Sequence, residues 1–399
     1  MIRQSGLGAM PTVLAKATPA MLLWARETAS MTVEEAARKI RANFDPERVR
    51  GWENGEGHPT LPQLRALSKA YRRPLAAFFL NERPRDFAIP RDFRGLGHRV
   101  FSRELSFELR AASERRDVAL GLYEELEEEP TNFELTCEMA EGVDVVAARA
   151  RQALAITVEQ QARWQDKYEA LRAWKMKLEE MGVLVFQVPG IPSSEMRGFS
   201  VYNRQLPIIA VNRGEDPVAR IFSLMHELTH LMLRQGGICD FDEEEVREEQ
   251  EQCVEVFCNA VAAEILVPEA DFLAQPAIAA HPARPRDWEE ATIVALARRY
   301  RVSRLVIVRR LLTFGRATGV FYTRKHAQYN AEFLRERAER QDPVPEKGGD
   351  KQLRILGNLF ARLVVDTYRS GGISLSEAVS YLGIKTRHLP EVERSLAAG

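Results

Sequence analysis

The sequence predicts a multidomain, mainly α-helical protein with a helix-turn-helix module at the N-terminus, a central α+β domain with a small sheet, and a helical C-terminal region. Amphipathic segments bounded by helix start and stop signals make up most of the chain. Short apolar segments suited to strands are concentrated between residues 183 and 211. With 399 residues, 45% of them hydrophobic, the chain is long enough for two or three hydrophobic cores.

The sequence pattern of the N-terminal segment predicts five short helices. An amphipathic helix over residues 19–28 comes first. Each of the next four is opened by a capping residue or a proline: Thr32, Asp45, Thr60 and Pro74. Five helices within about 65 residues, with a short turn between the second and the third, are typical of a helix-turn-helix domain.

The strand-like segments belong to the central domain. A helix over residues 168–181 leads into a strand over 183–188, and residues 197–202 and 206–211 are expected to pair as a hairpin. The run 218–233 follows as a helix that is apolar around most of its circumference, which indicates burial. A second apolar helix is expected over residues 253 to 266.

His226, Glu227 and His230 lie in the first of these apolar helices and form the pattern H-E-x-x-H. One helical turn separates the histidines, so both imidazoles project from one face and can share a metal ion, with Glu227 beside them as a base. The simpler alternative places the histidines on a polar stripe. It disagrees with the apolar surroundings, because unpaired polar groups on a buried helix cost about 1 to 3 kcal/mol each.

A catalytic zinc site needs a third protein ligand and an open position for water. Glu255 is the preferred candidate because it lies in the second apolar helix, whereas most carboxylates between residues 240 and 251 belong to a solvated segment. Asn259, one turn further on, shares its face and can hydrogen-bond a ligating histidine. The remaining alternatives for the third ligand are Glu264, Glu251 and Glu249.

Composition sets limits on the partners and the compartment. The chain has 56 Lys and Arg against 57 Asp and Glu, so no overall field favours nucleic acid or membrane. Residues 1–85 carry 14 basic and 8 acidic side chains, a net of +6, which leaves −7 for the remainder. The four cysteines form no C-x-x-C pair, and there is neither a secretory signal nor an apolar run of about 18 residues. We therefore expect a cytoplasmic protein with free thiols and no membrane contact.

Three segments of the central domain form one pattern of a strand and two helices. They are Pro207-Ile-Ile-Ala-Val-Asn212, Arg220-Ile-Phe-Ser-Leu-Met-His-Glu-Leu-Thr-His-Leu231, and Glu255-x-x-x-Asn259-x-Val-Ala-Ala-Glu-Ile-Leu-Val-Pro268. The combination resembles the ImmA/IrrE metallopeptidase family. The resemblance implies an α+β zincin-like metallopeptidase domain in which His226, His230 and Glu255 hold Zn²⁺ and Glu227 activates water. Thr229 replaces a glycine that the family often has before the second histidine, which crowds the helix packing but removes no ligand.

The N-terminal module carries Trp52-Glu-Asn-Gly55 followed by Pro59-Thr-x-x-Gln63-Leu64. This pattern resembles the XRE family of lambda-repressor-like DNA-binding domains over roughly residues 18–82. The resemblance implies that the third helix enters the major groove of double-stranded DNA, while Val49 and Trp52 face the core.

Three arginines are the candidate DNA contacts: Arg48 and Arg50 for bases or phosphates, and Arg41 for a phosphate. The alternative is a module that kept its fold and serves protein docking or dimerisation. Glu47 and Glu53 on the same helix are consistent with that alternative.

Segments rich in proline, glycine or charge mark the boundaries between domains. The arginine-bearing helical pair over residues 288–300 and 303–312 is expected to be structural rather than a second reader of nucleic acid. The predicted segments are an N-terminal tail (1–17), the helix-turn-helix domain (18–85), a linker with a long polar helix over 105–129 (86–143), the metallopeptidase domain (144–275), its helical extension (276–340), a linker (341–350) and a helical tail (351–399).

We expect a DNA-binding regulatory zinc metallo-endopeptidase that cleaves a repressor or antitoxin protein, because ImmA/IrrE members known to act this way cleave XRE-type repressors. The hairpin before the metal helix is expected to offer its edge to an extended peptide. The alternative is a transcriptional regulator whose metallopeptidase fold is a sensor or dimerisation body with little catalysis. The presence of Glu227 argues against it, since a scaffold has no chemical need for a base. XRE-type domains usually bind DNA as dimers, which makes a homodimer a further option.

Overall fold

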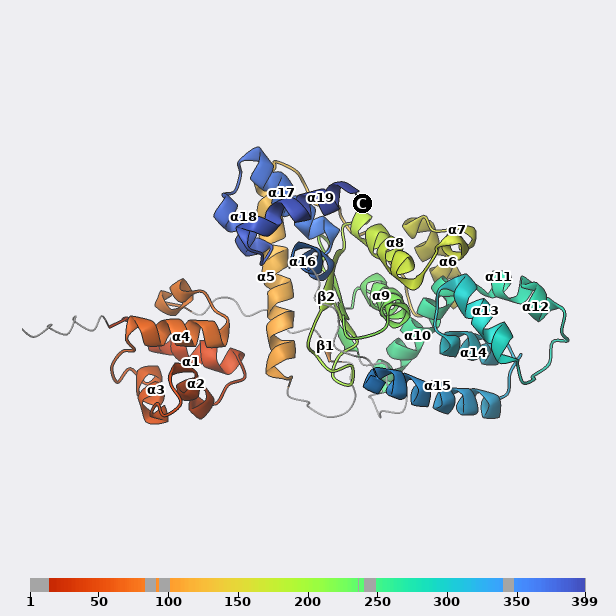
Figure 1. Cartoon of the computed structure of the whole chain (residues 1–399), viewed down its shortest axis with the longest axis horizontal. Coiled ribbons are helices and arrows are strands. Elements are labelled where there is room, and N and C mark those ends of the chain that lie inside the picture. Colours follow the sequence, from red (N-terminus) through yellow and green to blue (C-terminus); the bar gives the residue numbers. More distant parts are fainter. Residues whose placement is uncertain are drawn as a thin grey trace, which may run out of the picture. The chain divides into compact units, whose positions relative to one another are not determined.

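The computed structural model describes residues 14–82, 91–92, 101–235, 237–239, 249–339 and 348–398. The chain forms two compact units. The first consists of residues 1–89 and 99–111, and the second of residues 90–98 and 112–399. Figure 1 shows a helical N-terminal unit and a second unit in which helices surround a small sheet.

The first unit is the helix-turn-helix module. Its elements are α1 (Pro19–Thr28), α2 (Val33–Ile40), α3 (Pro46–Glu53), α4 (Leu61–Tyr71) and the 3₁₀ helix η1 (Leu75–Phe79). The expected caps are confirmed, because Thr32 and Thr60 form capping boxes and Asp45 accepts a hydrogen bond from the Glu47 backbone. The fifth helix is a 3₁₀ rather than an α-helix, the form that segments of a few residues commonly take.

Helix α3 buries the residues expected to face the core. Val49 and Trp52 pack with Trp24, Tyr71 and Phe78 in the core of this unit. Helix α5 (Arg103–Glu125) also begins here, since the Arg110 side chain donates a hydrogen bond to the Tyr71 carbonyl oxygen at 3.1 Å. The helix ends four residues before the expected Glu129, and the acidic run that follows it is largely exposed, as a solvated charge run should be.

The second unit is built on a sheet in the order β1-β5-β3-β4-β2. Its strands are β1 (Arg91–Asp92), β2 (Leu184–Val188), β3 (Gly198–Val201), β4 (Ile208–Asn212) and β5 (Gly237–Cys239). The expected hairpin is confirmed, because β3 and β4 pair antiparallel. The expectation that this hairpin supplies a free edge is wrong at Gly198 and Phe199, the two residues of β3 that pair with β5. Strand β5 pairs with β3 at Gly198 and Phe199, and β2 pairs with β4 along its length, so the outer strands are β1 and β2.

The alternation of side chains along β2 shows how the sheet is covered. Val185 faces the main hydrophobic core of the second unit. Most apolar residues of α9 belong to the same core. Phe186 faces the other way, where its ring lies 6.4 Å from that of Phe360 and 5.2 Å from the Arg115 guanidinium. All five residues of β2 are buried, as expected for a strand covered on both faces.

Two long helices carry the residues of the H-E-x-x-H pattern and its continuation. Helix α9 (Pro217–Met232) packs against β3, β4 and α8 (Lys167–Glu180), and α10 (Glu249–Leu266) packs against α9 and α6 (Val143–Leu154) (Figure 1). Asp216 caps α9, and Pro217 occupies its first turn. Helix α10 begins four residues earlier than expected.

Helix α11 (Glu269–Ala274) lies in the expected metallopeptidase domain. The helical extension comprises α12 (Pro276–Ala279), α13 (Glu290–Tyr300), α14 (Arg304–Thr313) and α15 (Gly319–Glu339), with α7 (Val158–Arg163) packed against α13. The arginines of the α13–α14 pair make internal contacts. Arg310 forms a buried ion pair with Glu264, and Arg304 pairs with Glu290 and Glu332. These contacts support a structural role for the pair. No described helix is both long and apolar enough to cross a membrane.

The C-terminal tail is part of the second unit. It comprises α16 (Gly348–Leu356), α17 (Asn358–Ser370), α18 (Leu375–Tyr381), η2 (Thr386–His388) and α19 (Leu389–Ala398). Helix α16 begins inside the segment expected to be a linker. It packs against β2, and the buried Glu179 of α8 accepts a hydrogen bond at 2.8 Å from the Asn358 backbone at the start of α17. The buried Glu179 side chain therefore caps the N-terminus of α17 in the C-terminal tail.

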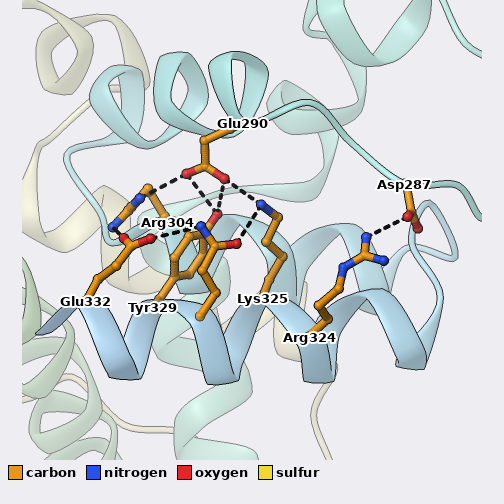
Figure 2. Close-up of polar contacts among 8 residues, drawn as sticks. Asp287, Glu290, Arg304, Arg324, Lys325, Tyr329 and Glu332 are labelled. Carbon is orange, nitrogen blue, oxygen red and sulfur yellow. Dashed lines mark hydrogen bonds and ion pairs between the residues drawn. The ribbon is translucent and has the colours of Figure 1, made fainter. Parts of the chain in front are cut away.

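Glu290 is expected to stabilise the helical extension. Its carboxylate accepts from Arg304 at 2.9 Å, Lys325 at 2.7 Å and Tyr329 at 2.9 Å, and so joins α13, α14 and α15 (Figure 2). Glu290→Ala should lower the free energy of unfolding by about 1 to 3 kcal/mol, because it removes one acceptor from three donors. The measurement is the calorimetric Tm of the second unit.

Asp287→Ala is the matched control, since its partner Arg324 and Asp287 itself are 59% and 60% exposed. We expect less than about 0.5 kcal/mol from this change. The donors lower the pKa of Glu290 although burial opposes them. The stabilisation is thus present at neutral pH and is lost as the pH falls below the ordinary value of 4.5 and through the lowered pKa. Equal Tm losses for the two variants at neutral pH would contradict this role.

Candidate metal centre

Helix α9 places His226, Glu227 and His230 inside the second unit. Neither histidine nor the glutamate exposes any surface to solvent. The histidines lie one turn apart on the same face, and their Nε2 atoms are 3.0 Å apart. Thr229 is buried as well. Its hydroxyl donates a hydrogen bond to the Met225 carbonyl oxygen at 2.9 Å, so its polar group has a partner within the helix and displaces neither histidine.

Glu255 meets the histidines from α10. One carboxylate oxygen lies 3.1 Å from His230 Nε2 and the other 3.4 Å from His226 Nε2. Among the described residues, these three side chains form a group whose possible ligand atoms all lie within 4.8 Å of one another. Two imidazoles and one carboxylate are a ligand set that suits zinc and related divalent metals.

The hydrogen bond behind His226 tests whether a cation fits. His226 Nδ1 lies 3.0 Å from Asn259 Oδ1, so Nδ1 carries the proton and donates it to the amide oxygen. His226 Nε2 is then an electron-pair donor, and it faces both the His230 Nε2 atom and the Glu255 carboxylate. Acceptors that converge in a buried space repel one another unless a positive charge lies between them. A proton on His230 supplies that charge when no metal is present, and a metal ion in its place would be held by the same three residues.

The protonation states of His226 and Glu255 agree with that fit, whereas contacts with Cys258 and Glu255 outweigh burial and raise the pKa of His230 when no metal is present. Burial lowers the pKa of His226 and keeps its imidazole neutral near pH 7. Burial opposes ionisation of Glu255, but the two histidines outweigh it and hold the pKa of Glu255 well below its usual range. A neutral imidazole and an ionised carboxylate are the forms that bind a metal ion.

Glu227 points to the strand beside α9. The Ser200 hydroxyl of β3 donates a hydrogen bond to Glu227 Oε2 at 2.8 Å, and Ser200 is fully buried. Gly198, two residues earlier on β3, lies so close that a Cβ atom there would be 2.7 Å from Glu227 Oε1. The sequence predicts a strand here. It does not show which side chains of that strand face α9, so both residues were missed.

Cys258 is a further neighbour of the centre that the sequence did not single out. It is fully buried on α10 and interacts with His230. Its spacing of three residues from Glu255 is the signal that could have suggested a position on the same face of the helix. Burial raises the pKa of the Cys258 thiol.

Glu264, one of the alternative third ligands, does not join the group. Glu264 is the partner of Arg310, and its other carboxylate oxygen accepts from the Glu269 backbone at 2.8 Å. The side chains of Glu249 and Glu251 lie outside the described residues. The described part of the structure therefore favours Glu255.

The candidate DNA contacts are all exposed on the first unit. The Arg48 guanidinium lies 5.2 Å from the ring centre of Phe44 and 5.9 Å from that of Trp52. Arg50 pairs with Glu47 on its own helix and with Glu34 at 3.9 Å. Arg41 follows the last residue of α2. Exposed ion pairs of this kind are weak and do not prevent an arginine from contacting DNA.

Two families of known proteins match the chain. Residues 178–312, from the end of α8 to α14, match the IrrE N-terminal-like domain, and this segment contains His226, Glu227, His230 and Glu255. Residues 22–78 match the helix-turn-helix family. The curated proteins include no match. The two domains occur in the expected order and support a DNA-binding regulator with an IrrE-like metallopeptidase domain.

Asn259 is expected to control metal affinity without being a ligand. Asn259→Ala removes the acceptor that fixes the orientation of His226, and such partners are typically worth about 10- to 100-fold in affinity. The measurement is titration of the metal-free full-length protein with Zn²⁺. Asn330→Ala, a change of an exposed asparagine on α15, is the matched control and should leave affinity unchanged. An affinity of Asn259→Ala equal to that of the control would show that the hydrogen bond has no such role.

Proposed function

We propose that this protein is a DNA-binding regulatory zinc metallo-endopeptidase that cleaves a repressor or antitoxin protein. The observation that carries the proposal is the burial of Glu227 beside the group formed by His226, His230 and Glu255. A buried glutamate next to three converging ligand atoms has the position of a general base. The helix-turn-helix match supplies the link to DNA.

Each residue of the centre has a defined task in peptide hydrolysis. His226, His230 and Glu255 would hold a zinc ion, which supplies a Lewis acid with an open position. Glu227 takes a proton from the attacking water at its carboxylate and delivers it to the leaving amine. Asn259 keeps the His226 Nε2 atom directed to the centre through its hydrogen bond to Nδ1.

The substrate class is inferred from the two domains together. ImmA/IrrE proteins that act in this way cleave XRE-type repressors, and this chain carries a module of the same type as those repressors. A shared DNA site would bring the peptidase close to a repressor bound there. The substrate we propose is thus a repressor or an antitoxin, since cleavage of such a protein would change transcription directly.

Glu227→Gln is expected to abolish cleavage while the metal stays bound. The amide keeps the size of the side chain but cannot take a proton, which should lower the rate by at least about 100-fold. The probe is a peptide library prepared from a bacterial proteome and incubated with the zinc-loaded full chain, with new N-termini mapped by mass spectrometry. Glu180→Gln, a change of an exposed residue on α8, is the control.

Two results would contradict the proposed activity. One is a parent protein that produces no new N-termini although it binds zinc. The other is cleavage by Glu227→Gln at the parent rate. A zinc-bound protein without cleavage would favour a regulator whose metallopeptidase fold acts as a sensor or dimerisation body.

DNA binding is predicted to depend on α3. Replacing both Arg48 and Arg50 by Ala should weaken binding at least about tenfold and flatten its dependence on salt, because two cationic contacts are lost. The probe is a double-stranded sequence selected from a random pool with the full-length protein. Lys69→Ala, in the last turn of α4, is the control. Undiminished binding with the parent salt slope would show that α3 is not the contact helix.

A further inference from the structure

We infer that Ser200 and Gly198 of β3 are positioning residues that hold the Glu227 carboxylate in one orientation. The inference deepens the proposed function, since it rests on Glu227 acting as the base. Neither residue needs to touch the substrate. Both act through the side chain that takes the proton.

The first support is the hydrogen bond from Ser200. Its hydroxyl lies 2.8 Å from Glu227 Oε2, and both residues are fully buried. A hydroxyl that donates to a carboxylate in a buried site makes a stronger bond than one between neutral groups. Bulk solvent does not reach Glu227 Oε2, so the protein itself supplies the hydrogen-bond donor to this oxygen. The direction of Oε2 is therefore set by the strand.

The second support is the close approach of Gly198. A Cβ at this position would lie 2.7 Å from Glu227 Oε1 and 3.1 Å from Glu227 Cγ. The same atom would lie 3.2 Å from the Ala210 carbonyl oxygen, so it is crowded by β4 as well as by Glu227. Any side chain larger than hydrogen at residue 198 displaces the Glu227 carboxylate.

The third support is the geometry of β3. Successive side chains of a strand point to opposite faces, so Gly198 and Ser200 share the face directed at α9. Ser200 pairs with Ile209 in the antiparallel ladder with β4, and Gly198 is paired on both sides, by β4 and β5. The two contacts thus come from a fixed backbone. A catalytic group held by fixed elements is ready before the substrate arrives.

Ser223 shows that a buried serine does not need a carboxylate partner. It lies on α9 itself, and its hydroxyl donates to the Ala219 carbonyl oxygen at 3.1 Å. Ser223 is almost fully buried, like Ser200, but its bond stays within the helix. Ser223→Ala removes the same atom from the same core, which makes it the matched control for Ser200→Ala.

The first experiment needs neither metal nor substrate. The Tm of the metal-free full-length protein is measured for Ser200→Ala, Glu227→Ala, the double variant, and Ser223→Ala in both backgrounds. Ser200→Ala should lower the Tm in the parent and have no further effect once Glu227 is replaced, because the two residues form one interaction. Ser223→Ala should cost the same in both backgrounds. An equal loss for Ser200→Ala in both backgrounds overturns the inference.

The second experiment measures catalysis with the zinc-loaded protein and a peptide from the library. Ser200→Ala should lower kcat at least tenfold while KM and zinc content stay at the parent values, and Ser200→Thr, which keeps the hydroxyl, should restore most of the rate. Gly198→Ala should lower kcat in the same way. Ser223→Ala should leave kcat unchanged.

A kcat for Ser200→Ala within twofold of the parent, or a loss confined to KM or zinc content, overturns the positioning role. If the parent cleaves no peptide, the proposed function fails instead. The metal-free unfolding cycle still decides whether Ser200 acts through Glu227. The two failures are therefore distinguishable.

Discussion

The burial of three ionisable side chains between α9 and α10 is the constraint on which the second unit depends. His226, His230 and Glu255 are at most 2% exposed, and taking such groups out of water costs several kcal/mol unless partners replace the lost solvation. Each helix supplies part of the compensation to the other: the carboxylate faces both imidazoles, and Asn259 accepts from His226. The packing of α9 on α10 thus fixes the ligand geometry before any ion binds.

The burial of ionisable side chains also bears on the contact between β3 and α9. Glu227 is buried beside the candidate ligands, and a buried carboxylate needs a hydrogen-bond donor from the protein. Strand β3 provides it from Ser200, and Gly198 lets the strand backbone come close enough for a hydrogen bond of 2.8 Å. Helix α9 is therefore held from two sides. Residues of α10 contact the two histidines of α9, and residues of β3 contact Glu227.

The sequence predicts features that depend on residues close together in the chain, and it misses contacts between elements that are distant in the chain. His226 was paired with His230, and Glu255 with Asn259, because helical spacing fixes which residues share a face, and Glu255 was preferred as third ligand because its helix is apolar. Ser200 was not predicted, because the contact depends on how a strand lies across a helix. Strand β5, which pairs with Gly198 and Phe199 at the edge of the hairpin, was not expected because it is three residues long and shows no strand-like periodicity. The start of α16 was missed for a similar reason, since this helix packs against β2, which is distant in the sequence.

The two helix-turn-helix-like parts of the chain differ in how their arginines are used. In the α13–α14 pair, Arg310 is 5% exposed and paired with a buried carboxylate, so releasing it for DNA would leave an unpaired charge in the core. In the first unit, Arg50 and its partners Glu47 and Glu34 are each about half exposed or more, and such pairs exchange at little cost for contacts with phosphate. The N-terminal segment also carries the net positive charge, whereas the rest of the chain is negative. The exposed arginines of the N-terminal unit therefore remain the candidates for DNA contact, and the buried ion pair of Arg310 supports a structural role for the second pair.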